Sequence, residues 1–86
     1  MADAGVTRPA VTLDVVKLWA KMQMAPQVIA SVVDPSRWLI VMPGGSVFGT
    51  GFAPMGQVDA EECAWHVAAT RGYADPVVIV TERVGE

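Results

Sequence analysis

Apolar residues recur along the chain with a helical period in two places and in short β-branched runs elsewhere. The first helix is predicted over residues 13–25, with Thr12 as its N-cap and Pro26 as the residue that stops it. Its apolar face follows the i, i+3, i+4, i+7 rule and should lie in the core. Four side chains form that face: Val15, Leu18, Trp19 and Met22.

Three consecutive strands should follow, because β-branched and aromatic runs alternate there with turn residues. Asp34-Pro35-Ser36-Arg37 has turn chemistry, and Gly44-Gly45 supplies the positive φ angles of a tight hairpin. The expected strands are residues 27–33, 38–42 and 46–52.

A second helix should begin near Asp59, which forms a capping-box pattern with Glu62 and has Val58 and Cys63 at the hydrophobic-staple positions. Gly72 suits a left-handed C-cap. The face that packs on the sheet is expected to be small: Ala60, Ala64, Val67 and Ala68.

The last strand is predicted over Val77–Thr81 and is apolar enough for an interior position in the sheet, and the residues after it should fray. Together these elements predict one α+β domain over residues 11–86, preceded by a flexible tail over residues 1–10. The expected architecture has the order α-β-β-β-α-β, a mainly antiparallel sheet of three to four strands, and two helices packed on one face.

The hairpin around Gly44-Gly45 is expected to be apolar on both sides. If Met42 lies opposite Val47, one face carries four large side chains: Trp38, Ile40, Met42 and Val47. The other face is also largely apolar. Since both helices are expected on one face, the other face would need a second copy or another protein to cover it.

Composition also favours a protein partner. Hydrophobic residues make up 52% of the chain and charged residues only 17%, which leaves few charges to cover the surface of a small domain. A homodimer or an obligate complex is therefore expected. Trp65 lies off the small helical face and is a candidate anchor, and Glu61 and Glu62 are candidate contacts for a basic partner. The net charge of −3 and the absence of a basic run argue against direct binding of nucleic acid.

No catalytic, cofactor or metal site is predicted. Gly44 and Gly49 have the spacing of a phosphate-binding loop, but its lysine and its following helix are missing. Cys63 and His66 are too few ligands for a structural zinc site. The alternative is a ligand-binding or enzymatic domain with a site at a homodimer interface, built from Ser46, Thr50, Cys63 and His66.

A single cysteine excludes a disulfide within the chain and favours a reducing compartment. The first ten residues do not have the pattern of a signal peptide, and the longest apolar runs are too short to cross a bilayer. We therefore expect a cytoplasmic protein that does not bind a membrane. The composition lacks Asn and is rich in Ala, Val and Gly, which points to a bacterial or phage gene.

The helix–three strands–helix order resembles that of the double-stranded-RNA-binding domain. That family grips phosphates with lysines at the start of its second helix, where this chain has acidic residues, so the resemblance does not imply RNA binding. In size, charge and lack of a catalytic motif the chain is similar to small acidic inhibitors encoded by phages, anti-CRISPR proteins among them. The expected function is a non-enzymatic protein-binding module, an inhibitor or an accessory subunit.

Overall fold

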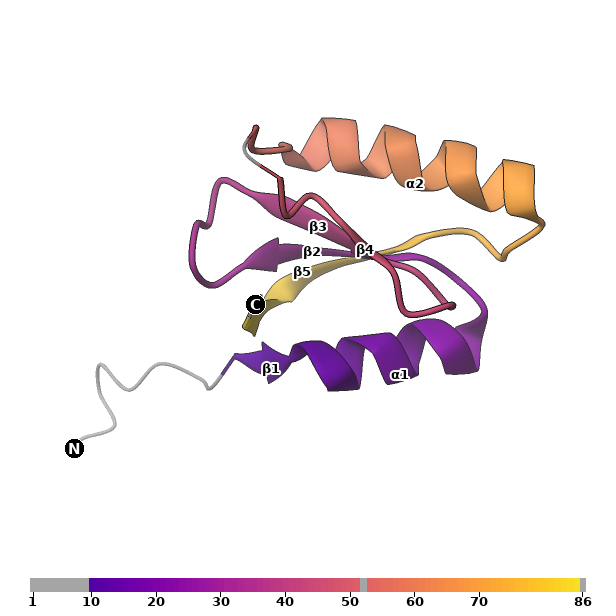
Figure 1. The fold of residues 1–86 in the computed structure, drawn as a ribbon, viewed down its shortest axis with the longest axis horizontal. Helices are drawn as coiled ribbons and strands as arrows, with labels where there is room; N and C mark the ends of the chain where they lie inside the picture. The colour runs from indigo at the N-terminus through magenta and orange to yellow at the C-terminus, as the bar shows by residue number, and fades with distance from the viewer. Residues whose placement is uncertain (1–9, 52, 86) are drawn as a thin grey trace.

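The computed structural model describes residues 10–51 and 53–85 and arranges them as one mixed β-sheet between two helices (Figure 1). The elements are β1 (Val11–Thr12), α1 (Leu13–Gln23), β2 (Gln27–Ser31), β3 (Trp38–Val41), β4 (Val47–Phe48), α2 (Gln57–Arg71) and β5 (Val77–Gly85). Within these described ranges, neither helix has the length and hydrophobicity needed to cross a membrane.

The sheet has the strand order β1-β5-β2-β3-β4. β2, β3 and β4 form an antiparallel meander, whereas β5 pairs in parallel with β2 on one side and with β1 on the other. The α+β class and the interior position of β5 are therefore confirmed. The expectation of a mainly antiparallel sheet of three to four strands is only partly correct, because β5 and β1 extend the meander to five strands through parallel pairs.

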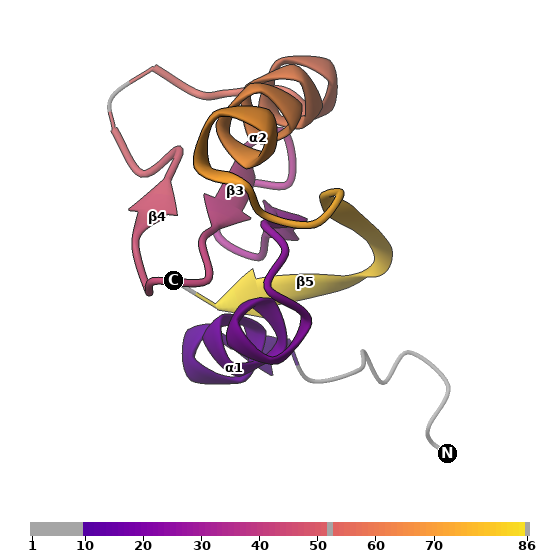
Figure 2. The same ribbon diagram turned by 90° about the vertical axis from the view of Figure 1, so that its right-hand side faces the viewer.

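The two helices lie on opposite faces of the sheet (Figure 2). The expectation that both pack on one face is wrong, and the topology explains why. Two parallel crossovers, β1-α1-β2 and β4-α2-β5, traverse the sheet in opposite directions. Crossovers of this kind are almost always right-handed, so two that run in opposite directions must place their helices on opposite faces.

Each face of the sheet has its own apolar core. On the α1 side, buried residues of the helix pack against strand residues: Val16, Ala20, Ile29, Leu39, Val41 and Val84. On the α2 side, the buried set is Val28, Ile40, Met42, Ala60 and Ala64. Successive residues of β2 and β3 alternate between the two cores, which is why these strands read as continuous apolar runs.

The prediction that one apolar face of the hairpin needs a partner is therefore wrong. α1 packs on one face of the five-stranded sheet and α2 packs on the other, so β2 and β3 are covered on both sides within a single chain, although Phe48 of β4 is 37% exposed and Val80 of β5 is 69% exposed. The large apolar side chains that remain most exposed on the helices are Leu18 and Met22 of α1 and Val58 and Trp65 of α2.

The register of the hairpin differs by one residue from the expected one. Val41, not Met42, lies opposite Val47, and Ile40 lies opposite Phe48. The turn carries three residues between Met42 and Ser46, and Gly45 has a φ of 97°. A three-residue loop that ends in a left-handed glycine is a common hairpin connection. Because side chains alternate with a period of two, the shift moves Val47 to the α1 face.

The buried side of α1 is also different from the predicted one. Val16 and Ala20 are fully buried, whereas Leu18 is 53% exposed and Met22 is 72% exposed. A second stripe with helical spacing, formed by Leu13, Val16 and Ala20, faces the sheet instead. The small side chain of Ala20 lets the helix approach closely. Of the predicted face, Val15, Leu18 and Met22 remain outside, whereas Trp19 is partly buried against this core as predicted.

The observed ends of α1, α2 and β5 agree only in part with those predicted from capping residues and turn residues. Thr12 caps α1 by accepting a hydrogen bond from the backbone N–H of Val15 at 3.2 Å, and Gly72 ends α2 in a left-handed conformation, as predicted. The predicted start of α2 is wrong, because the N-cap is Gly56 and makes no side-chain cap. The strand β5 does not fray after Thr81 but continues to Gly85.

Candidate protein-binding surface

The sheet residues expected to bind a partner do not form one surface. Ile40 and Met42 are buried beneath α2, and Trp38 is partly buried against the same core. Val47 is partly buried on the α1 face. Ile40 and Met42 are internal, so they are not available to contact a partner.

The helix residues expected to bind a partner do lie together. Glu61, Glu62 and Trp65 line one open depression of about 420 Å³ on the outer side of α2, and Val58 completes it. We call these four residues the α2 surface. Trp65 is 49% exposed and Val58 is 67% exposed. The spacing explains the grouping, since residues i, i+3, i+4 and i+7 lie on one side of a helix.

The inner side of α2 explains why this surface faces outward. Ala60, Ala64 and Ala68 are buried against the sheet and leave no room there for an indole ring. Trp65 follows Ala64 directly, so it is rotated by about 100° from the buried side. The indole is thus held at the surface by its position in the helix.

Two glutamates lie beside the indole on the N-terminal side of α2. Glu61 and Glu62 line the depression, and Asp59 lies in the first turn of α2. Acidic residues near a helix N-terminus stabilise the helix through its dipole, so part of this pattern serves the fold. The same side chains give the α2 surface an acidic rim beside an apolar centre.

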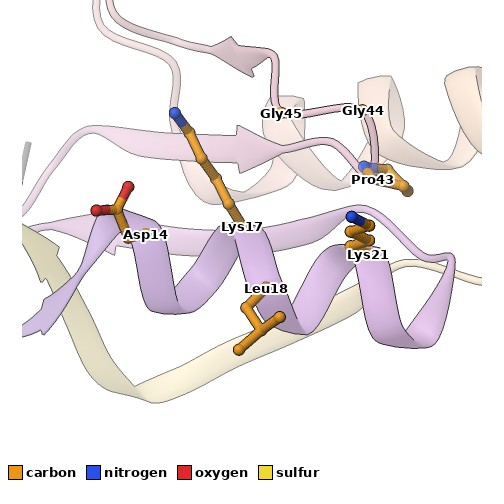
Figure 3. A pocket seen from close by; sticks show the side chains of 7 residues that line it. All are labelled: Asp14, Lys17, Leu18, Lys21, Pro43, Gly44 and Gly45. Atoms are coloured by element: carbon orange, nitrogen blue, oxygen red, sulfur yellow. The ribbon is translucent and has the colours of Figure 1, made fainter.

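A second depression, of about 480 Å³, lies between α1 and the β3–β4 turn (Figure 3). Seven residues line it: Asp14, Lys17, Leu18, Lys21, Pro43, Gly44 and Gly45. The side chains of Lys17 and Lys21 leave α1 in different directions, so the two amino groups do not converge on one point (Figure 3). The arrangement is a basic helix side, without the convergent donors of a phosphate site.

The four residues of the alternative, ligand-binding hypothesis are not brought together. Ser46 and Thr50 are exposed at the two ends of β4, and Cys63 and His66 are exposed on α2. Cys63 was expected in the core as a staple residue, and its exposure corrects that expectation. In the part of the chain that the structure describes, no group of three His, Cys, Asp or Glu side chains is placed to hold a metal ion.

Comparison of the chain with family models, with curated proteins and with solved structures gave no match. The function is therefore inferred from the geometry of the surface itself.

The sequence pattern does not reveal one feature of the α2 surface and one feature of α1. Val58 was interpreted as a staple residue, although its spacing of seven from Trp65 places both on one helix side. The exposed apolar residues of α1 were interpreted as core, because their stripe is the more hydrophobic of two stripes with helical spacing.

Proposed function

We propose that this chain is a small, non-enzymatic protein-binding module and that the α2 surface is its contact region. One observation carries the proposal: Trp65 is half exposed beside two glutamates, on a helix whose opposite side is fully occupied by the sheet. Tryptophan is among the residues most enriched at the energetic centres of interfaces. An apolar ring with an acidic rim suits a basic partner that offers an apolar pocket.

The exposed half of the indole is large enough to matter. A tryptophan buries about 200 Å² in total, and covering half of that area at about 25 cal/mol per Å² contributes about 2–3 kcal/mol before the entropic costs of association are subtracted. Glu61 and Glu62 add less to affinity because they are near solvent, but they accelerate encounter with a basic surface and make binding sensitive to salt.

In its more specific form, the proposal is that the chain is a bacterial or phage-encoded inhibitor, anti-CRISPR-like in type, or an accessory subunit of a cytoplasmic complex. Occupation of a basic groove by the acidic α2 surface would exclude the groove's own ligand. The net charge of −3 permits a basic partner and argues against direct contact with nucleic acid.

Affinity capture from a bacterial lysate tests the proposal. The tagged chain is compared with Trp65→Glu, with the double variant Glu61→Lys/Glu62→Lys, and with Val33→Glu as the matched control. Val33 is 75% exposed and lies outside the α2 surface, so its change introduces the same charge elsewhere.

We expect one protein to be retained by the wild-type chain and by Val33→Glu, and lost with Trp65→Glu. The charge-reversed variant should retain less of it, and the difference should shrink at high salt. Retention of the same partner by Trp65→Glu at wild-type yield would show that the α2 surface is not the contact region.

A further inference from the structure

The outer side of α1 is a second exposed apolar stripe, on the face of the molecule opposite α2 (Figure 1). Val15, Leu18 and Met22 are 37%, 53% and 72% exposed. Lys17 and Lys21 lie beside this stripe, one helical turn apart. We call these five residues the α1 surface.

The α1 and α2 surfaces are matched in length. Val15 and Met22 are seven residues apart, as are Val58 and Trp65, so each stripe spans two helical turns, or roughly 10 Å. Two helices can pack along stripes of this length by placing the side chains of one between those of the other.

The two surfaces are opposite in charge. Lys17 and Lys21 outnumber Asp14 on the outer side of α1 and leave it with a net positive charge, whereas Glu61 and Glu62 make the α2 surface acidic. If two chains pack α1 against α2, each apolar stripe is covered and each pair of like charges faces the opposite sign. Packing of α1 against α1, or of α2 against α2, would place like charges together and is disfavoured.

We propose that this chain associates with itself head to tail, with the α2 surface of one copy packed on the α1 surface of the next. The two surfaces lie on opposite faces of the sheet, so each pair leaves one α1 surface and one α2 surface unused. A contact of this kind is heterologous and forms an open series unless its rotation closes a ring. Association should therefore increase continuously with protein concentration.

A second copy fits the α1 surface better than a membrane does. Stable binding to an anionic membrane takes clusters of about four to eight basic residues, and the α1 surface has two. Its neighbour Asp14 reduces the positive charge further.

Complementation between two variants tests the proposal by sedimentation velocity. Leu18→Glu removes the α1 surface and leaves the α2 surface intact, and Trp65→Glu does the reverse. We expect each variant alone to be monomeric at concentrations where the wild-type chain associates. An equimolar mixture should form a one-to-one dimer with twice the monomer mass, because one good surface of each kind remains.

The controls separate this interface from others. Val33→Glu should associate like the wild-type chain, and circular dichroism should show all variants folded. A wild-type chain that stays monomeric at millimolar concentration would overturn the proposal. Association of either variant alone would also overturn it, because a symmetric contact would then form through the surface that remains intact. A mixture that stays monomeric although the wild-type chain associates would overturn it too, because the mixture supplies one intact surface of each kind. Binding of the wild-type chain to anionic vesicles that is lost in Leu18→Glu would assign the α1 surface to lipid instead.

The inference shares the α2 surface with the proposed function, but only the inference needs α1. Leu18→Glu should therefore lose self-association and still capture the partner. If the wild-type chain captures a partner but does not self-associate, the proposed function survives and the inference fails. If it self-associates but captures no partner, the inference survives and the proposed function fails.

Discussion

Leu39 and Ile40 are adjacent residues of β3 whose side chains point to opposite faces of the sheet. Leu39 packs in the core beneath α1 and Ile40 in the core beneath α2, and both are fully buried. Leu39→Ala therefore tests whether the chain covers the α1 face of the sheet, and Ile40→Ala tests whether it covers the α2 face.

The burial sets the expected magnitude. Removal of a fully buried Leu or Ile side chain costs about 2–5 kcal/mol, from lost transfer free energy and from the cavity that remains. A domain of 86 residues is stable by roughly 4–13 kcal/mol, so either loss is a large fraction of the total. Both Leu39→Ala and Ile40→Ala should lower the free energy of unfolding by this amount, whereas Val33→Ala should change it by less than about 0.5 kcal/mol.

Urea denaturation followed by circular dichroism measures these differences, at low micromolar concentration so that self-association does not contribute. The urea midpoint should fall by on the order of 1 M or more for each core variant. If a variant does not fold, Ile40→Val gives a milder test of the α2 face, with an expected loss of about 1 kcal/mol. A loss below about 0.5 kcal/mol for either alanine variant would refute the reasoning, because the face concerned would then be open to solvent.

Three further predictions follow from local geometry. Gly49→Ala should lower the free energy of unfolding by more than about 1 kcal/mol in urea denaturation, because a Cβ there would lie 2.6 Å from the backbone oxygen of Trp38 and the φ of 100° strains any other residue; Gly44→Ala, which meets no atom within 4 Å, is the control. Thr12→Ala should lower the free energy of unfolding by about 1 kcal/mol because α1 loses its N-cap, and Thr12→Ser should keep most of this stability. Equal stability of the wild-type chain and both variants would show that the cap does not stabilise the fold. Asp34 accepts hydrogen bonds from the side chain and the backbone N–H of Ser36, and these bonds hold its pKa below the usual value. The ionised carboxylate therefore stabilises the fold above the unfolded pKa of about 3.9, and this contribution is lost as the pH falls through the folded pKa. An NMR titration that places the pKa of Asp34 above about 3.9 would contradict this prediction.

The elements that local chemistry specifies could be predicted from the sequence. Thr12 marks the start of α1 and Gly72 the end of α2, and the interaction that each makes spans at most one turn of helix. The alanine face of α2 was equally clear, because Ala60, Ala64 and Ala68 repeat every four residues with no competing apolar stripe of small side chains.

The features that depend on distant pairing could not be predicted. The strand β1 has two residues and exists only because it pairs with the end of β5, more than 70 residues away. The direction of each crossover follows from the position of β5 between β1 and β2, and that position decides which face each helix covers. A sequence pattern indicates an apolar strand but does not indicate its neighbours.

The candidate binding residues divide in the same way between local and distant information: those on α2 could be predicted, and those on the sheet could not. The exposure of Trp65 follows from the inner side of its own helix, which is local information. The expected sheet surface depended on both helices lying on one face, so Ile40 and Met42 were misplaced along with the topology. On α1, the choice between two stripes is made by the fit of Ala20 against the sheet, which only the packed structure reveals.

The central claim is that partners contact the outer sides of the helices, because the sheet is covered by its own chain. Fluorine NMR of the chain labelled with 5-fluorotryptophan tests this directly, since the three tryptophans occupy α1, β3 and α2. On addition of the partner retained in the capture experiment, we predict that the Trp65 resonance shifts and loses its sensitivity to solvent while the Trp38 resonance does not change. A shift of Trp38 with an unchanged Trp65 would place the contact on the sheet and contradict the account.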